Sequence, residues 1–180
     1  LTLIDGDAVE KTNLNRQLVA AKSTIGQQKT EAMRNRLLDV SDCFVTTRSC
    51  RIDEQTVAGA MPESADYIVD AIDQLSGKLA LVSFAQDKGI PIISCMGAGN
   101  RRDASRFYVT DIYQTAGDPL ARRMRQALRK LGIDALEVVY SDEERSQPLE
   151  NGAIGSLAPV TAAAGLVAAS HVIARLSAGV

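Results

Sequence analysis

Several polar side chains near the start of the chain have the types and spacing that nucleotide chemistry requires. An apolar run ends in Asp5, and Asn13, Arg16 and Lys29 follow it. An acid at the carboxyl end of a strand can accept hydrogen bonds from both ribose hydroxyls, which is the role predicted for Asp5. Arg16 and Lys29 can neutralise phosphate charge as fixed cations, and Asn13 can donate to a phosphate oxygen without adding charge.

A second set of acids follows an apolar stretch further along the sequence. Tyr67–Val69 is a continuous apolar run that predicts a strand buried on both faces, and Asp70 and Asp73 come after it. Because ligands of open α/β sheets bind at the carboxyl ends of strands, we expect Asp73 to lie over the site. Asp70 is interpreted as holding the loop. The alternative role for Asp73 is to cap the helix that follows.

These residues form a pattern that resembles a known superfamily. The run D-x-D-x-V-x-x-x-N-x-x-R-Q, with G-x-x-K about ten residues on, is similar to the ATP-binding core of the HesA/MoeB/ThiF superfamily, the adenylating enzymes related to the ubiquitin-activating ones. The resemblance implies an α/β, Rossmann-like fold with a mostly parallel open sheet, helices on both faces, and further strands and helices towards the C-terminus. It also implies ATP and Mg²⁺ as cofactors.

The same resemblance assigns roles to individual residues. Asp5, Asn13, Arg16 and Lys29 take the ATP-contacting positions of the superfamily, and Asp73 lies close to the metal and the triphosphate. Arg16 and Asp73 are therefore the expected catalytic residues, with Asp73 also contacting the nucleotide and positioning Mg²⁺. The alternative interpretation of the first loop is a solvated segment that carries two surface cations.

A later stretch narrows the resemblance to one branch. The run G-A-G…D…V-x-D-I…T…D-P-L-A-R within residues 97–130 is similar to the tRNA threonylcarbamoyladenosine dehydratases, which activate a tRNA-borne carboxylate with ATP and cyclise it, releasing AMP and pyrophosphate. This likeness covers nearly the whole chain. It implies the modified adenosine of a tRNA anticodon loop as substrate, a homodimer, a sulfur-transfer protein as a further partner, and a cytoplasmic location without membrane contact.

The D-P-L-A-R stretch also predicts a helix with two distinct faces. Asp118 caps it, Pro119 occupies its first position, and Gly132 ends it. The expected apolar face is formed by Leu120, Met124, Leu128 and Leu131. A different face carries Arg122, Arg125 and Arg129, which we interpret as a phosphate-contacting surface for tRNA, extended by Arg101 and Arg102. The alternative is an ordinary solvated face.

Composition sets limits on these functions. A chain of 180 residues is expected to form one domain, and a net charge of −2 means that nucleic-acid binding requires a local basic patch. The three cysteines contain no C-x-x-C pair, which argues against a disulfide framework and a four-cysteine zinc site, and favours a reducing cytosol. Cys95 is interpreted as a buried structural thiol. No cysteine lies beyond it, which argues against thioester transfer.

Local patterns predict the remaining elements. We expect helices at 27–38, 53–60, 76–88 and 159–174, the last as a packed helix, and strands at 44–48, 91–95, 107–110 and 136–140. The lone His171 is assigned a structural role. In dinucleotide-type units a glycine-rich turn precedes the acid by about twenty residues. Residues 1–180 are therefore expected to be one adenylating domain that begins inside the fold, without the first strand, glycine loop and helix.

Three other functions remain open at this point. Adenylation of a ubiquitin-like sulfur carrier would predict C-x-x-C pairs and a crossover cysteine. An NAD-dependent dehydrogenase would use Asp5 but leave Asn13, Arg16 and Lys29 without a task. A non-catalytic nucleotide-binding domain is the third, and it would apply if the glycine loop is absent.

Overall fold

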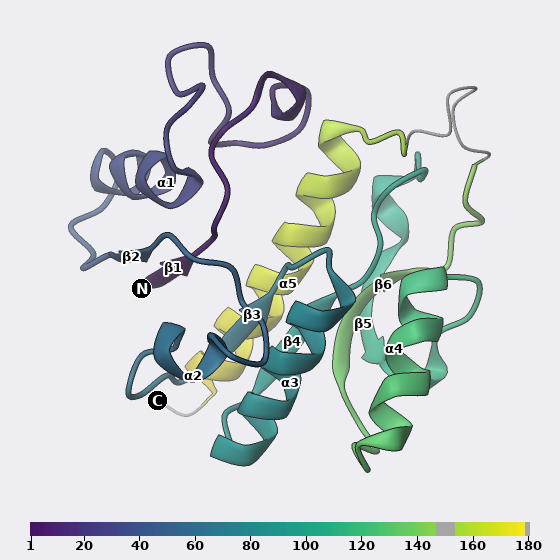
Figure 1. Cartoon of the computed structure of the whole chain (residues 1–180). Helices are drawn as coiled ribbons and strands as arrows, with labels where there is room; N and C mark the ends of the chain where they lie inside the picture. Colours follow the sequence, from purple (N-terminus) through teal and green to yellow (C-terminus); the bar gives the residue numbers. More distant parts are fainter. Residues whose placement is uncertain (147–153, 179–180) are drawn as a thin grey trace.

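The computed structural model of the chain describes residues 1–146 and 154–178 (Figure 1). Its strands are β1 (Thr2–Ile4), β2 (Thr46–Arg48), β3 (Ile68–Asp70), β4 (Ile92–Cys95), β5 (Phe107–Asp111) and β6 (Glu137–Ser141). Its α-helices are α1 (Lys29–Leu38), α2 (Val57–Ala60), α3 (Leu75–Lys88), α4 (Pro119–Lys130) and α5 (Ala158–Ser177). Short 3₁₀ helices, η1 (Lys11–Asn13), η2 (Ala104–Arg106) and η3 (Ile112–Gln114), lie between them.

The strands form two sheets in the described part of the chain. The larger sheet has the order β3-β4-β6-β5, in which β3, β4 and β6 run parallel and β5 is antiparallel to β6. The smaller sheet pairs β1 with β2 in parallel. The mostly parallel α/β architecture predicted from the sequence is therefore confirmed, with its strands divided between two sheets.

Helices cover both faces of the larger sheet, as predicted (Figure 1). On one face, Val82 of α3 and Met124 and Leu128 of α4 pack against Val138. On the other, Val160, Ala164 and Ala168 of α5 pack against Ile93 and Val139. Because adjacent residues of a strand point to opposite faces, Val138 and Val139 of β6 serve the two layers of the core.

The expected helix boundaries mostly hold, because the capping residues act as the sequence indicates. Gly89 adopts φ 65° and stops α3. The Asp118 side chain accepts a hydrogen bond from the Ala121 amide at the start of α4. Leu131 is a correction: it is 54% exposed, because the helix ends at Lys130 and the chain turns away at Gly132. Ile133 is buried in the core instead.

Two other expectations need revision. Val69 of β3 is 49% exposed, so this strand is not buried on both faces. The helix predicted from Asp53 begins only at Val57, because Asp53 caps the turn before it by accepting from the Gln55 and Thr56 amides.

The C-terminal helix α5 packs on one side only. Its opposite side exposes Leu166 and Ile173, so the packed helix expected from the sequence is only half covered. By length and composition alone, α5 is apolar enough to cross a membrane.

Candidate functional site

A short antiparallel pairing brings Lys29 back to the end of β1. The Val9 amide donates to Gln27 O at 2.8 Å, the Gly26 amide donates to Val9 O at 2.9 Å, and the Lys29 amide donates to Asp7 O at 3.0 Å. The intervening loop is thereby closed at its base. Lys29, at the start of α1, consequently lies beside the acids that follow β1.

Lys29 contacts both of these acids. Its ammonium lies 2.9 Å from Asp7 Oδ2 and 4.0 Å from Asp5 Oδ2, and its side chain is only 16% exposed. Arg51, after β2, holds the other oxygen of Asp7 at 2.9 Å. The hydrogen bond from Lys29 lowers the pKa of Asp7, and Arg51 adds to this effect. We call Asp5, Asp7, Lys29 and Arg51 the acid–lysine cluster.

Gly6 allows this cluster to form. A Cβ at Gly6 would lie 2.6 Å from Arg51 Cγ and 2.9 Å from Arg51 N, so a side chain would push the two strand ends apart. Neither Arg51 nor Asp7 was expected to contribute to the site from the sequence alone. The glycine between the two acids was the signal that the chain passes close to another segment there.

Asp5 lies at the carboxyl end of β1, as the sequence predicts. Its Oδ1 accepts from the Asp7 amide at 2.8 Å, which fixes the carboxylate at the carboxyl end of β1. The side chain remains 41% exposed, so the carboxylate is accessible to a ligand.

Asn13 and Arg16 lie on the loop between β1 and α1. Asn13 Oδ1 accepts from the Glu10 amide at 2.9 Å, and the residue is buried. Arg16 donates through one terminal nitrogen, Nη1, to Thr12 O at 2.8 Å and to Asn15 Oδ1 at 2.9 Å. Within residues 1–146 and 154–178, no hydrogen bond joins Arg16 to the acid–lysine cluster. Arg16 is linked to the cluster through the loop between β1 and α1, whose two ends carry Asp7 and Lys29.

Asp70 and Asp73 have different environments. Asp70 is fully buried at the end of β3, where it binds Lys78 at 3.0 Å and accepts from the Ile72 amide at 2.9 Å. Asp73 follows this turn and is exposed. The helix cap position belongs to Gln74, so the capping alternative for Asp73 is wrong.

Close packing links this second turn to the acid–lysine cluster. A Cβ at Gly77, in the first turn of α3, would lie 2.7 Å from Ile52 O and 3.1 Å from Ile72 Cγ2. Ile52 directly follows Arg51 of the cluster, and Ile72 directly precedes Asp73. The two acid-bearing turns are therefore held in one neighbourhood.

Magnesium would have to be held by few protein ligands. The described residues contain no group of three or more His, Cys, Asp or Glu side chains arranged for a metal. Mg²⁺ on a nucleotide is commonly bound by one or two carboxylates together with the phosphates, so a single exposed carboxylate at Asp73 fits this requirement.

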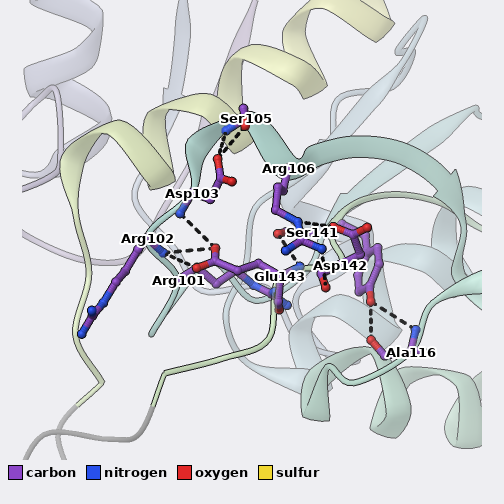
Figure 2. A network of polar contacts seen from close by, with 10 residues as sticks. Arg101, Arg102, Asp103, Ser105, Arg106, Ala116, Ser141, Asp142 and Glu143 are labelled. Carbon is purple, nitrogen blue, oxygen red and sulfur yellow. Dashed lines mark hydrogen bonds and ion pairs between the residues drawn. The ribbon is translucent and has the colours of Figure 1, made fainter.

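The turn after β4 is fixed by Arg101, which is buried and not part of a basic surface (Figure 2). Its guanidinium contacts Gly97 O at 2.9 Å, the Glu143 carbonyl, and Asp118 Oδ2 at 3.2 Å. The Glu143 carboxylate accepts from the Arg102 and Asp103 amides. The expected extension of the tRNA surface through Arg101 is therefore wrong, because its charge is used inside the protein.

The cations of α4 are not equivalent either. Arg125 is partly buried and donates to Thr115 Oγ1, so it is turned towards the body of the protein. Arg122 is exposed, and Arg129 is exposed with its guanidinium 5.3 Å from the Tyr113 ring centre. Of the three arginines expected on one face, only Arg122 and Arg129 present their charge to solvent.

Cys95 is partly buried, and His171 is held by neighbouring side chains, as expected of structural residues. Burial raises the pKa of Cys95 to about 11, so its thiol is protonated and weakly nucleophilic at neutral pH. His171 Nε2 lies 3.0 Å from Glu137 Oε2, and its ring meets Tyr67 edge-on. Although burial opposes it, the pKa of Glu137 is lowered by hydrogen bonds from Arg175, His171 and Tyr67.

Comparisons with known proteins agree with the observed fold. The family model described as the ThiF family matches residues 1–179. The tRNA threonylcarbamoyladenosine dehydratase of Bacillus subtilis is 39% identical over 145 residues, which cover 79% of this chain and 57% of that protein. The chain thus spans little more than half of this relative.

A solved structure extends the likeness to nearly the whole chain. The crystal structure of the E. coli tRNA N6-threonylcarbamoyladenosine dehydratase, TcdA, in complex with ATP has a TM-score of 0.92 and 33% identity, covering 99% of this chain and 75% of that chain. A more distant relative, the molybdopterin-synthase adenylyltransferase of Escherichia coli, is 30% identical over 158 residues, covering 87% of this chain and 59% of that protein.

Proposed function

Because the chain belongs to the ThiF family, we propose that it is an ATP-dependent adenylating enzyme acting on threonylcarbamoyladenosine in tRNA. The carboxylate of the modified base attacks the α-phosphorus of ATP, the α–β bridging bond breaks, and pyrophosphate leaves. A nitrogen of the same modified group attacks the acyl carbonyl, loses its proton and expels AMP. The ring closes, and the base loses the elements of water.

One observation supports this proposal above all others: 99% of the chain matches, at a TM-score of 0.92, a structure of the E. coli dehydratase solved with ATP. The match includes the turns that carry the acid–lysine cluster and Asp73. The ATP-contacting residues of this chain remain our own assignment.

In this assignment the chain's residues bind and orient the nucleotide. Asp5 accepts from the ribose hydroxyls. Lys29 exchanges part of its contact with Asp7 for phosphate, and Arg16 and Asn13 donate to phosphate oxygens. Asp73 holds Mg²⁺, which when bound supplies further charge neutralisation at the triphosphate. Positioning and charge stabilisation carry the catalysis, since the acyl-adenylate already has a good leaving group.

The assembly and location of the enzyme are further parts of the proposal. We place it in the cytoplasm, as a ligase-type homodimer that meets tRNA and a sulfur-transfer protein there, without membrane contact. Leu166 and Ile173 form an exposed apolar side of α5 that a second copy would cover. Arg122 and Arg129 supply the tRNA-contacting charge, while Arg125 supports the helix from within.

ATP–pyrophosphate exchange tests the reaction. We expect exchange that requires tRNA carrying threonylcarbamoyladenosine, followed by AMP release and a product lighter by one water. Unmodified tRNA is the matched control.

The weaker likeness to a molybdopterin-synthase adenylyltransferase favours a second candidate, adenylation of a ubiquitin-like carrier protein. Exchange that requires such a carrier and ignores tRNA would establish it. ATP binding without exchange under either condition would leave a nucleotide-binding domain, and tight NADH binding without ATP binding would indicate a dehydrogenase.

A further inference from the structure

The segment Ile154–Leu157, which leads into α5, is hydrogen-bonded to the turn that follows β4. The Gly155 amide donates to Asn100 Oδ1 at 2.7 Å, and the Asn100 amide donates to Gly155 O at 2.8 Å. The Asn100 carbonyl accepts from the Ser146 amide at 2.8 Å. A single asparagine thus binds both the segment that enters α5 and the one that leaves β6.

The backbone at this turn is adapted to the contact. Asn100 has φ 58° and is the one non-glycine residue with positive φ in the described ranges. Asparagine tolerates this conformation better than most residues, and here its side chain also bonds the neighbouring segment. A Cβ at Gly99 would lie 2.3 Å from Ile154 Cγ2, so the two segments are in close contact.

The same segment is fastened on its other side to the loop that carries Arg16. Asn15 Nδ2 donates to Ser156 O at 3.0 Å, while Asn15 Oδ1 accepts from Arg16 at 2.9 Å. Both ends of one side-chain amide are therefore used. The hydrogen bonds of Arg16 to Thr12 O and to Asn15 Oδ1 both use Nη1. The orientation of Nε and Nη2 is therefore set in part by Asn15, which is itself bonded to Ser156 O.

We propose that Asn15 and Asn100 are positioning residues that couple the segment Ile154–Leu157 to Arg16. This inference rests on the proposed function, because it takes Arg16 as the cation that contacts ATP phosphate. Phosphate held by Arg16 fixes Asn15, and Asn15 in turn fixes Ser156. Because binding couplings are reciprocal, an anchored segment also favours the productive orientation of Arg16.

Hydrogen–deuterium exchange of a peptide covering Gly155 and Ser156 tests the coupling. In the wild type we expect ATP to slow exchange there, and Asn15→Ala to abolish this response. Asn35→Ala, which removes an exposed asparagine of α1, is the matched control and keeps the response. Asn100→Gly keeps the positive φ but removes the side-chain acceptor, so without nucleotide it speeds exchange of the Gly155 amide.

The separate values of kcat and KM distinguish a positioning role from a purely structural one. Asn15→Ala should lower kcat for ATP–pyrophosphate exchange about tenfold with little change in KM, since misorientation of a catalytic group acts on the chemical step. Asn15→Asp keeps the acceptor for Arg16 but loses the donor to Ser156, so it restores kcat and not the exchange response.

The possible failures are distinguishable. If the wild type does not bind ATP in equilibrium dialysis, both the proposed function and the coupling are wrong. If ATP binds and Asn15→Ala responds like the wild type, only the coupling is overturned. Unchanged Gly155 exchange in nucleotide-free Asn100→Gly would overturn the anchor at Asn100.

Discussion

Two aspartate–lysine pairs in this protein use the same chemistry in opposite environments. At the end of β1, Lys29 lies 2.9 Å from Asp7, whose side chain is 44% exposed. At the end of β3, Lys78 lies 3.0 Å from Asp70, and both side chains are fully buried. Each pair stands at the carboxyl end of a parallel strand, where ligands of such sheets bind.

The partners of the two lysines distinguish a cation that we propose binds nucleotide from one that is fully used within the protein. Lys78 donates to Asp70, to Ser94 Oγ at 3.1 Å and to Cys95 O at 2.7 Å, which uses all three of its protons. It has no capacity left for a ligand. Lys29 is shared between two partly exposed carboxylates, so it can exchange one of them for phosphate at small cost.

The largest effect we expect is on folding, at the buried pair. Lys78→Met would leave the Asp70 carboxylate buried without its cation and lower the free energy of unfolding by about 3–5 kcal/mol. Lys29→Met, at the partly exposed pair, should cost about 1 kcal/mol, because Asp7 keeps Arg51 and solvent as partners. Urea denaturation measures both.

Replacing both buried partners separates charge from shape. Lys78→Met combined with Asp70→Leu should recover much of the lost stability, because no unpaired charge remains. Equal stability of the two single lysine variants would contradict the distinction between the pairs.

The second effect is on chemistry, at the exposed site. Arg16→Ala or Asp73→Asn should reduce ATP–pyrophosphate exchange about 100- to 1000-fold, the usual cost of removing one charge-stabilising group. Folding should be unchanged, since Asp73 is exposed and Arg16 bonds only its own loop in the described structure. Circular dichroism and urea denaturation provide the control. Near-normal turnover in either variant would refute our site assignment.

The third effect concerns α4, where Arg125 is bonded within the protein and Arg122 and Arg129 are exposed. The double variant Arg122→Glu, Arg129→Glu should weaken tRNA binding and reduce the slope of log affinity against log salt by about 1–2, as expected when roughly two phosphate contacts are lost. Arg36→Glu, on the exposed surface of α1, is the control. An unchanged slope would make α4 an ordinary solvated helix.

The sequence was sufficient for most elements because their signals are local. Asp118 with Pro119 predicts the start of α4, and Gly89 the end of α3, through groups that act within one turn. Asp5 was placed at the end of its strand for the same reason. These residues do not depend on which distant segment packs against them.

The failures at the candidate site involve contacts between separate segments, whereas the late start of α2 and the exposure of Leu131 have local causes. Arg101 and Arg125 have the composition of a basic surface, yet Asp118 and Thr115 draw them inward. Arg51 joins the site only because it meets Asp7, 44 residues away in the sequence. Lys78 has no local sign of burial, since its partners come from two other strands.

The smallest effect concerns pH and the exposed pair. Lys29 lowers the pKa of Asp7 in the folded protein, so the ionised carboxylate stabilises the fold. This stabilisation is present above the unfolded pKa of about 4 and is lost as the pH falls through the lower folded value. Asp7→Asn should therefore reduce stability slightly at pH 7 and flatten the decline below about pH 4. Unfolding free energies across this range test it, with Asp87→Asn on the exposed side of α3 as control. Because Asp7 is partly exposed, high salt should reduce the stability difference between the wild type and Asp7→Asn. If the two stability curves run parallel across this pH range, Lys29 holds Asp7 too weakly to affect folding, and the pair can open for a ligand without a measurable loss of stability.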